Sequence, residues 1–112
     1  MAYSAVGENK NIQPMTQKNL NDHWGGKSNH SDEYKGWTKE QYFNRATELA
    51  RSAVGGDILG YKAPDGSIVR YDRQTNDFVK SGDSGIRTMF KPKRGESYFT
   101  SQFIRDGGTQ ND

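Results

Sequence analysis

The sequence predicts an α+β domain, in which one or more N-terminal helices pack on a twisted antiparallel meander of four to five strands. Two observations predict this fold class. Apolar side chains recur at helical spacing over residues 42–53, and residues 58–104 divide into short apolar segments separated by turn-forming residues. Strands that follow one another through short turns pair antiparallel, so the preceding helix is left to cover one face of the sheet.

Composition limits the classes of protein to which the chain can belong. It has 112 residues, of which 30% are hydrophobic, and it has no cysteine. These values predict one small domain with a thin core, without disulfides or a thiolate zinc site. Two histidines do not predict a metal cluster, and no phosphate-loop fingerprint is present, so we expect no metal and no cofactor. Apolar runs are too short for a membrane span or a signal peptide, so we expect no membrane insertion by this domain.

The N-terminal part of the chain is polar. Residues 1–21 are rich in Asn, Gln, Lys and Ser and predict a flexible linker or arm, within which a short helix after Thr16 would place Leu20 and Trp24 on one face. We expect the folded domain over residues 22–106 and a frayed tail over residues 107–112. The polar, glycine-rich stretch from His23 onward predicts a loop, a common place for functional side chains.

The clearest element is a helix that begins after Thr38. Thr38 followed three residues later by Gln41 is a capping-box pattern, and Glu40 lies where the helix dipole favours an acid. The pair Gly55 and Gly56 predicts the end of this helix, since glycine is the preferred residue just past a helix C-terminus.

Strands and turns follow the helix. Pro64-Asp65-Gly66 predicts a tight turn, because proline presets one backbone dihedral and glycine accepts positive φ. Polar or glycine-rich turns are expected at residues 73–76, 82–85 and 92–96. The strands that these turns separate are expected at residues 58–63, 67–72, 77–80, 86–91 and 97–104.

Positive charge gathers in the C-terminal half. Between Arg70 and Arg105 there are eight lysines and arginines against four acids, although the formal net charge of the chain is only +2. A basic cluster of this kind binds phosphate backbones, or it is simply a solvated surface. The sequence leaves both interpretations open.

The order of several short motifs resembles a known group of nucleases. The motifs are His30-Ser31-Asp32-Glu33-Tyr34, Glu40-Gln41-Tyr42, Asp65-Gly66, Val69-Arg70-Tyr71-Asp72, Asn76-Asp77-Phe78-Val79, Ile86-Arg87-Thr88-Met89-Phe90-Lys91-Pro92 and Tyr98-Phe99. In this order they resemble the Barnase–EndoU–colicin–RelE nuclease superfamily, and within it the C-terminal RNase toxin domains of CdiA-type contact-dependent growth inhibition proteins. Asn29 and Ser31 stand where members of that family often have lysine and glycine.

The resemblance implies a metal-independent endoribonuclease toxin that cleaves tRNA in competition between bacteria. Such a domain is secreted or displayed at the cell surface as part of a larger exoprotein, and it acts in the cytoplasm of the target cell. The implied partners are tRNA, a cognate immunity protein that blocks the toxin and, for some relatives, the elongation factor EF-Tu.

Metal-independent RNA cleavage uses the 2′-hydroxyl of the substrate as nucleophile and leaves a 2′,3′-cyclic phosphate. The enzyme must move protons near neutral pH and stabilise a negatively charged phosphorane, which calls for histidine, arginine and hydroxyl groups. The candidates for this catalysis are His30, Glu33, Arg87 and Thr88, with His23 as an additional candidate. The candidates for RNA binding are Lys27, Arg70, Lys91, Lys93, Arg94 and Tyr98.

Some of these roles have structural alternatives. Arg70 would equally form an ion pair with Asp72 or Asp77. In a regular strand Arg87 and Lys91 would face the side opposite Thr88, so all three reach one site only if the strand bends or contains a bulge. An RNA-binding or protein-interaction module without catalysis, with a basic sheet surface, would also explain the charge, but it gives His30 no role.

Overall fold

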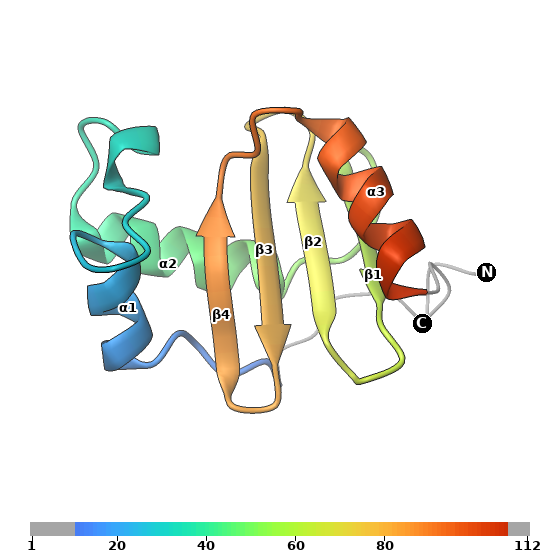
Figure 1. Ribbon diagram of the computed structural model, residues 1–112, viewed down its shortest axis with the longest axis horizontal. Coiled ribbons are helices and arrows are strands. Elements are labelled where there is room, and N and C mark those ends of the chain that lie inside the picture. Colours follow the sequence, from blue (N-terminus) through green and yellow to red (C-terminus); the bar gives the residue numbers. More distant parts are fainter. Residues whose placement is uncertain (1–10, 108–112) are drawn as a thin grey trace.

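The computed structural model describes residues 11–107, which form an α+β fold (Figure 1). The α+β class, with N-terminal helices followed by a four-stranded antiparallel meander, is as the sequence predicts, whereas the helix at the C-terminal end is not. The helical elements are α1 (Gln17–His23), the 3-10 turn η2 (Ser31–Glu33), α2 (Lys39–Ala50) and α3 (Glu96–Asp106). The strands are β1 (Ile58–Lys62), β2 (Ile68–Asp72), β3 (Asp77–Gly82) and β4 (Gly85–Phe90).

The sheet is a simple meander in the order β1-β2-β3-β4, and it is covered unevenly. Helix α2 crosses one face, whereas α3 lies on the other face beside β1 and β2 (Figure 1). In the first turn of α3, Tyr98 also packs on Phe78 of β3 and Phe90 of β4, with ring centroids 5.1 and 5.5 Å apart.

Two apolar clusters hold the layers together, one on each face of the sheet. On the α2 face, side chains of α2 pack on the centre of β3 and β4, joined by residues of the N-terminal segment. On the α3 face, Phe99 packs on Tyr61 and Tyr71, with ring centroids 5.6 and 5.9 Å apart. The buried and partly buried members of this second cluster include seven aromatic residues: Tyr61, Tyr71, Phe78, Phe90, Tyr98, Phe99 and Phe103.

Helix α2 begins where the sequence predicts, and its capping box is confirmed. Thr38 Oγ1 accepts a hydrogen bond from Gln41 N at 3.1 Å, and Gln41 Oε1 accepts one from Thr38 N at 2.8 Å. The buried face of the helix carries Tyr42, whose hydroxyl donates to Met89 O at 2.5 Å. The cap and this bond fix the helix against β4.

Replacing Thr38 with alanine should lower the free energy of unfolding by about 1 kcal/mol, because one backbone N–H of the first turn loses its acceptor. The Thr38→Ser variant keeps a hydroxyl at this position and should stay within a few tenths of a kcal/mol of the wild type. Urea unfolding followed by circular dichroism measures both values. Equal midpoints for the alanine and wild-type proteins would show that the cap contributes nothing.

The predicted strand at residues 97–104 is wrong, because this segment forms helix α3. Tyr98, Phe99 and Phe103 have strand-forming side chains, but Phe99 and Phe103 are four residues apart and face Tyr61 together. A helix buries both rings on one side, whereas a strand would alternate Tyr98 and Phe99 between its two faces. Packing on the sheet therefore outweighs local β-propensity.

The packed domain also begins earlier than expected. The predicted short helix is confirmed as α1, with Thr16 Oγ1 accepting from Asn19 N at 3.2 Å. Before it, Ile12 and Met15 are buried in the core, and Arg51 donates two hydrogen bonds to Ile12 O. Residues 11–21 are thus part of the fold and not of a linker.

The outer parts of the predicted arm and tail, residues 1–10 and 108–112, lie outside the described residues. Gly107 belongs to the fold as the C-cap of α3, with a left-handed φ of 65°. Over residues 11–107, no helix has the length and apolar character needed to cross a membrane.

Candidate active site

A cleft lies where the end of β4, the turn after it, the start of α3 and the η2 segment meet. It has a volume of about 440 Å³ and a wall of eight residues: His30, Glu33, Phe90, Lys91, Pro92, Lys93, Arg94 and Tyr98. We call it the His30 cleft. Six of the eleven site residues that the sequence predicts line it, although His30 and Tyr98 are far apart along the chain.

His30 and Glu33 form a hydrogen-bonded pair at one side of the cleft. His30 Nδ1 lies 2.6 Å from Glu33 Oε2, and Glu33 Oε1 accepts a hydrogen bond from Lys91 N at 2.7 Å. The pair is local in origin, because His30 is the N-cap of η2 and residues three apart in a 3-10 turn lie on one side. Both oxygens of Glu33 are therefore engaged, and the carboxylate is fixed between the histidine and β4.

The His30 ring is held in a stack. Its centroid lies 5.6 Å from that of His23 and 5.4 Å from that of Phe90, with interplanar angles of 29° and 21°. Among residues 11–107, the structure gives the Nε2 of His30 no hydrogen-bond partner. The carboxylate at Nδ1 places the proton of the neutral ring there, so Nε2 is left as an acceptor at the opposite edge.

The loop before His30 is fixed by a residue that the sequence analysis did not select. Asn29 Oδ1 accepts hydrogen bonds from Gly25 N at 2.7 Å and from Ser31 N at 3.0 Å, and His30 N donates to His23 O at 2.8 Å. Asparagine commonly forms hydrogen bonds with nearby backbone groups in this way. Its position in a glycine-rich loop is therefore a sequence pattern that predicts such a turn around Asn29.

Lys93 and Arg94 supply the positive charge of the cleft. Both are exposed in the turn between β4 and α3, which is closed by a hydrogen bond from Gly95 N to Pro92 O at 3.1 Å. Arg94 donates to Ser101 Oγ at 3.3 Å, and its Cζ lies 5.9 Å from the centroid of the Tyr98 ring. Two exposed cations beside a histidine are suited to hold a phosphate group.

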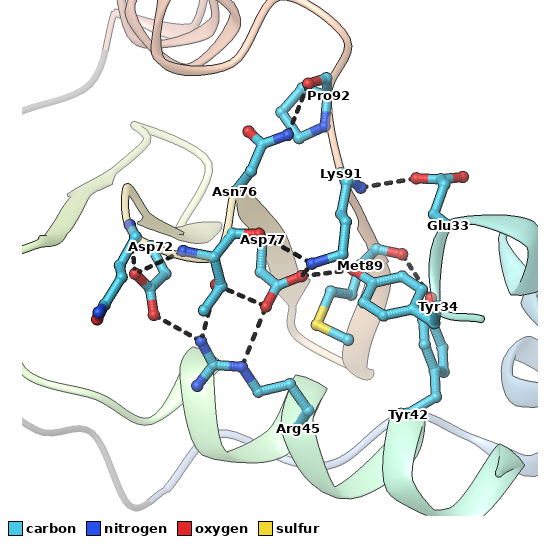
Figure 2. A network of polar contacts seen from close by, with 12 residues as sticks. Glu33, Tyr34, Tyr42, Arg45, Asp72, Asn76, Asp77, Met89, Lys91 and Pro92 are labelled. Carbon is cyan, nitrogen blue, oxygen red and sulfur yellow. Dashed lines mark hydrogen bonds and ion pairs between the residues drawn. The ribbon is translucent and has the colours of Figure 1, made fainter. Parts of the chain in front are cut away.

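Lys91 contributes its backbone to the cleft and its side chain to a different network (Figure 2). Its Nζ donates to Asp77 Oδ1 and to Thr75 O, both at 2.9 Å, and lies 4.8 Å from the centroid of the Tyr34 ring. This ammonium is thus engaged on the α2 side of the sheet, and its expected RNA-binding role stays a prediction.

Arg70 does not lie on an RNA-binding surface. It is 2% exposed, and it donates to Ser52 O at 2.8 Å and to Val69 O at 2.9 Å. Burial lowers the pKa of its guanidinium to about 10. Gly60 makes room for this side chain, since a Cβ there would lie 2.5 Å from Arg70 Nη1. The expectation of RNA contact fails because the alternation along β2 turns this arginine toward the interior.

Arg87 and Thr88 lie on β4 but do not line the His30 cleft. The strand does contain an irregularity, since Ile86 pairs with Ser81 and Thr88 pairs with Lys80, which leaves Arg87 as the extra residue of a bulge. A Cβ on Gly82 would lie 2.4 Å from Arg87 Nη2, so Arg87 extends toward the β3–β4 hairpin. That hairpin is at the opposite end of β4 from the cleft (Figure 1).

Thr88 is nearer to the cleft than Arg87. It shares a sheet face with Phe90, two residues further along the strand, which is a rise of about 6.6 Å. Thr88 therefore lies outside the lining of the cleft but on the sheet face that carries Phe90, whereas the predicted catalytic role of Arg87 loses its geometric basis.

His23 and Lys27 complete the predicted set. His23 Nδ1 is 2.8 Å from Asn19 O, and its ring supports the outer face of His30 without lining the cleft. Lys27 is exposed in the loop between α1 and η2. Of the two, only His23 contacts a residue of the cleft among the contacts that the structure gives.

Behind the cleft, Asp77 is the centre of a buried polar network that sequence reasoning missed (Figure 2). Asp77 is 1% exposed and accepts hydrogen bonds from Tyr34 at 2.8 Å, Lys91 at 2.9 Å and Arg45 at 3.2 Å. Tyr34 follows Glu33, and Lys91 follows Phe90. The network thus ties together the two chain segments that carry the histidine pair and the floor of the cleft.

The network shifts the ionisation of its members. Burial alone would raise the pKa of Asp77, but hydrogen bonds from Lys91, Thr75 and Tyr34 outweigh it and hold the pKa below its ordinary value. Burial, with the nearby charge of Asp77, raises the pKa of Tyr34. Asp77 is therefore a carboxylate and Tyr34 a neutral donor at every pH where the protein would work.

Comparison of the chain with protein-family models and with curated proteins gives no match in either case. Within the described part of the chain, no group of three or more His, Asp or Glu side chains is arranged to hold a metal ion.

Proposed function

We propose that this protein is an endoribonuclease that cleaves RNA by attack of the substrate 2′-hydroxyl on the adjacent phosphorus. One observation carries the proposal: the His30–Glu33 pair, with His30 Nδ1 2.6 Å from Glu33 Oε2, lines a cleft whose rim carries Lys93 and Arg94. A histidine oriented by a carboxylate, next to exposed cations, supplies proton transfer and phosphate binding in one place.

In this mechanism the 2′-hydroxyl loses its proton to a base and bonds to phosphorus, while the P–O5′ bond breaks and O5′ gains a proton to leave as a 5′-hydroxyl. The other product is a 2′,3′-cyclic phosphate. His30 takes part in proton transfer through Nε2, and Glu33 holds the ring in position and stabilises the imidazolium that forms when Nε2 gains a proton. Lys93 and Arg94 stabilise the negative charge that grows on the phosphorane oxygens. Glu33 is a positioning residue here, since both of its oxygens are engaged by His30 and Lys91.

The resemblance to the CdiA-type toxin domains extends the proposal to a biological role. We infer a toxin of bacterial competition that cleaves tRNA, is delivered by a larger exoprotein and acts in the cytoplasm of the target cell. A cognate immunity protein would block it, and EF-Tu is the host factor that we would test first. The exposed Lys93 and Arg94 fit an acidic partner as well as they fit RNA.

Replacing Glu33 with glutamine should lower the cleavage rate by about tenfold to hundredfold, as for other groups that orient a functional histidine. The amide of glutamine can donate to Nδ1, which would place the ring proton on Nε2 and remove the acceptor. The Glu33→Asp variant keeps the charge and should recover part of the rate. Initial rates over a range of pH test this, and a pH profile and rate unchanged in Glu33→Gln would contradict the orienting role.

The proposal is tested by incubating the purified protein with total bacterial RNA in EDTA, with and without cell extract, beside a His30→Ala protein prepared in parallel. Discrete tRNA fragments that end in cyclic phosphate, and that are lost with the variant, would support it. Cleavage only with extract would show a required host factor. No cleavage under either condition would contradict the proposal and favour an RNA-binding module without catalysis.

A further inference from the structure

The floor of the His30 cleft is apolar and aromatic, which proton transfer and phosphate binding do not require. Phe90 and Tyr98 are both half-buried, and buried Pro92 also lines the cleft. We propose that these side chains form a stacking subsite for one unpaired nucleobase of the RNA, beside the phosphate that is cut. This inference rests on the proposed ribonuclease function, and it names the kind of nucleotide that the site accepts.

The aromatic floor is preorganised. Phe78, which is 2% exposed, lies beneath both rings, with its centroid 5.3 Å from Phe90 and 5.1 Å from Tyr98. The Phe90 and Tyr98 centroids are 5.5 Å apart at an interplanar angle of 74°. Three rings in mutual contact cannot turn independently, so a base that enters pays little to order them.

A guanidinium and an imidazole lie against these two rings. On the Tyr98 side, Arg94 is held by Ser101 with its Cζ 5.9 Å from the ring centroid. On the Phe90 side, the His30 ring stacks with its centroid 5.4 Å away. Aromatic rings flanked by a cation and an imidazole match a nucleotide, whose base is a flat ring joined through ribose to a phosphate.

The geometry also selects the state of the RNA. A base in a duplex is already stacked on both faces and paired along one edge, so it enters such a cleft only after it has left the helix. The volume of about 440 Å³ lies in the usual range for sites of small ligands. The site therefore takes nucleotides from loops, bulges or single strands rather than from stems.

The binding test compares a nucleoside 3′-monophosphate with ribose 5-phosphate, which lacks the base, in titrations followed by NMR of the histidine and tyrosine rings. The wild type should bind the nucleotide about tenfold or more tightly than ribose phosphate, as a stacked base contributes about five- to hundredfold. In Tyr98→Leu this preference should fall below about twofold. The matched control is Phe103→Leu on the same helix, whose ring packs on Tyr61 outside the cleft with centroids 5.3 Å apart.

Equal binding of the two ligands by the wild type would overturn the subsite. This comparison does not need the Tyr98→Leu protein, whose folding is checked by thermal melting. A second arm uses a DNA hairpin with one ribonucleotide, placed in the loop or in the stem. Cleavage in the loop at least about a hundredfold faster supports the inference, and equal rates overturn it while leaving the ribonuclease proposal intact. Base-dependent binding without any cleavage would support the subsite and contradict the ribonuclease.

Discussion

Replacing His30 with alanine should lower the rate of RNA cleavage by about 10²- to 10⁴-fold, which is the usual contribution of a positioned acid or base. Among the described residues that line the cleft, His30 is the one side chain that a carboxylate orients, through Nδ1, and that also has a second nitrogen, Nε2, available to substrate. Under the proposed function, Lys93 and Arg94 would still bind RNA without the imidazole, so the loss should fall on the rate constant and much less on affinity. Single-turnover cleavage of a defined RNA measures the rate constant directly.

Two further measurements separate lost chemistry from lost structure. Free imidazole should restore part of the activity of the His30→Ala protein, because a small cavity replaces the ring between His23 and Phe90. His23→Ala is the matched control, because it removes the ring that packs on His30 but does not line the cleft. The cleavage rate of this variant should fall by less than about tenfold. If His23→Ala proved as damaging as His30→Ala, the assignment of the proton transfer to His30 would fail.

Replacing Asp77 with asparagine should lower the free energy of unfolding by about 3 kcal/mol, near the lower end of the loss from removing one partner of a buried ion pair. The side chain is 1% exposed, whereas its partners Arg45 and Lys91 are 18% and 29% exposed. These cations would recover some hydration, which limits the loss. Arg45 also keeps its bond to Asp72 Oδ2 at 2.6 Å. Chemical denaturation gives the value, and a loss below about 1 kcal/mol would show that the network is not a main source of stability.

The same residue should make stability depend on pH in one direction. The pKa of Asp77 is lower in the folded protein than in the unfolded chain, where it is about 3.9. Its contribution is therefore complete above pH of about 5 and is lost as pH falls through the unfolded and then the folded pKa. Asp77→Asn should flatten this acid limb, while Asp32→Asn, which changes an exposed carboxylate, should leave it unchanged. An unaltered acid limb in Asp77→Asn would contradict the assignment.

Stability and function are joined through this network. Tyr34 and Lys91 bond to Asp77 through their side chains (Figure 2). Their neighbours Glu33 and Phe90 contribute the carboxylate and an aromatic ring to the lining of the His30 cleft. Loosening the network would let the η2 segment separate from β4. We expect the Asp77→Asn protein to lose cleavage activity before it unfolds.

Local sequence determined the parts of the fold whose signals lie within a few residues. The Thr38 capping box, the Pro64-Asp65-Gly66 turn and the short apolar segments between polar turns predict helix α2, the β1–β2 turn and the four strands, because capping and turn dihedrals are short-range effects. The pairing of His30 with Glu33 belongs to the same class, since residues three apart in one 3-10 turn meet without help from the rest of the chain.

Tertiary structure decided the features that depend on packing between distant segments: the conformation of residues 97–104 and the burial and pairing of the basic side chains. Residues 97–104 form a helix because Phe99 and Phe103 bury their rings on Tyr61 only in that conformation. In the sequence, Arg70 and Lys91 cannot be distinguished from Lys93 and Arg94. In the structure Arg70 is buried and Lys91 is bound to Asp77. Lys93 and Arg94 are exposed at the cleft. Charge and residue type are local properties, but burial and ion pairing are set by side chains distant in sequence, and only the folded chain brings these together.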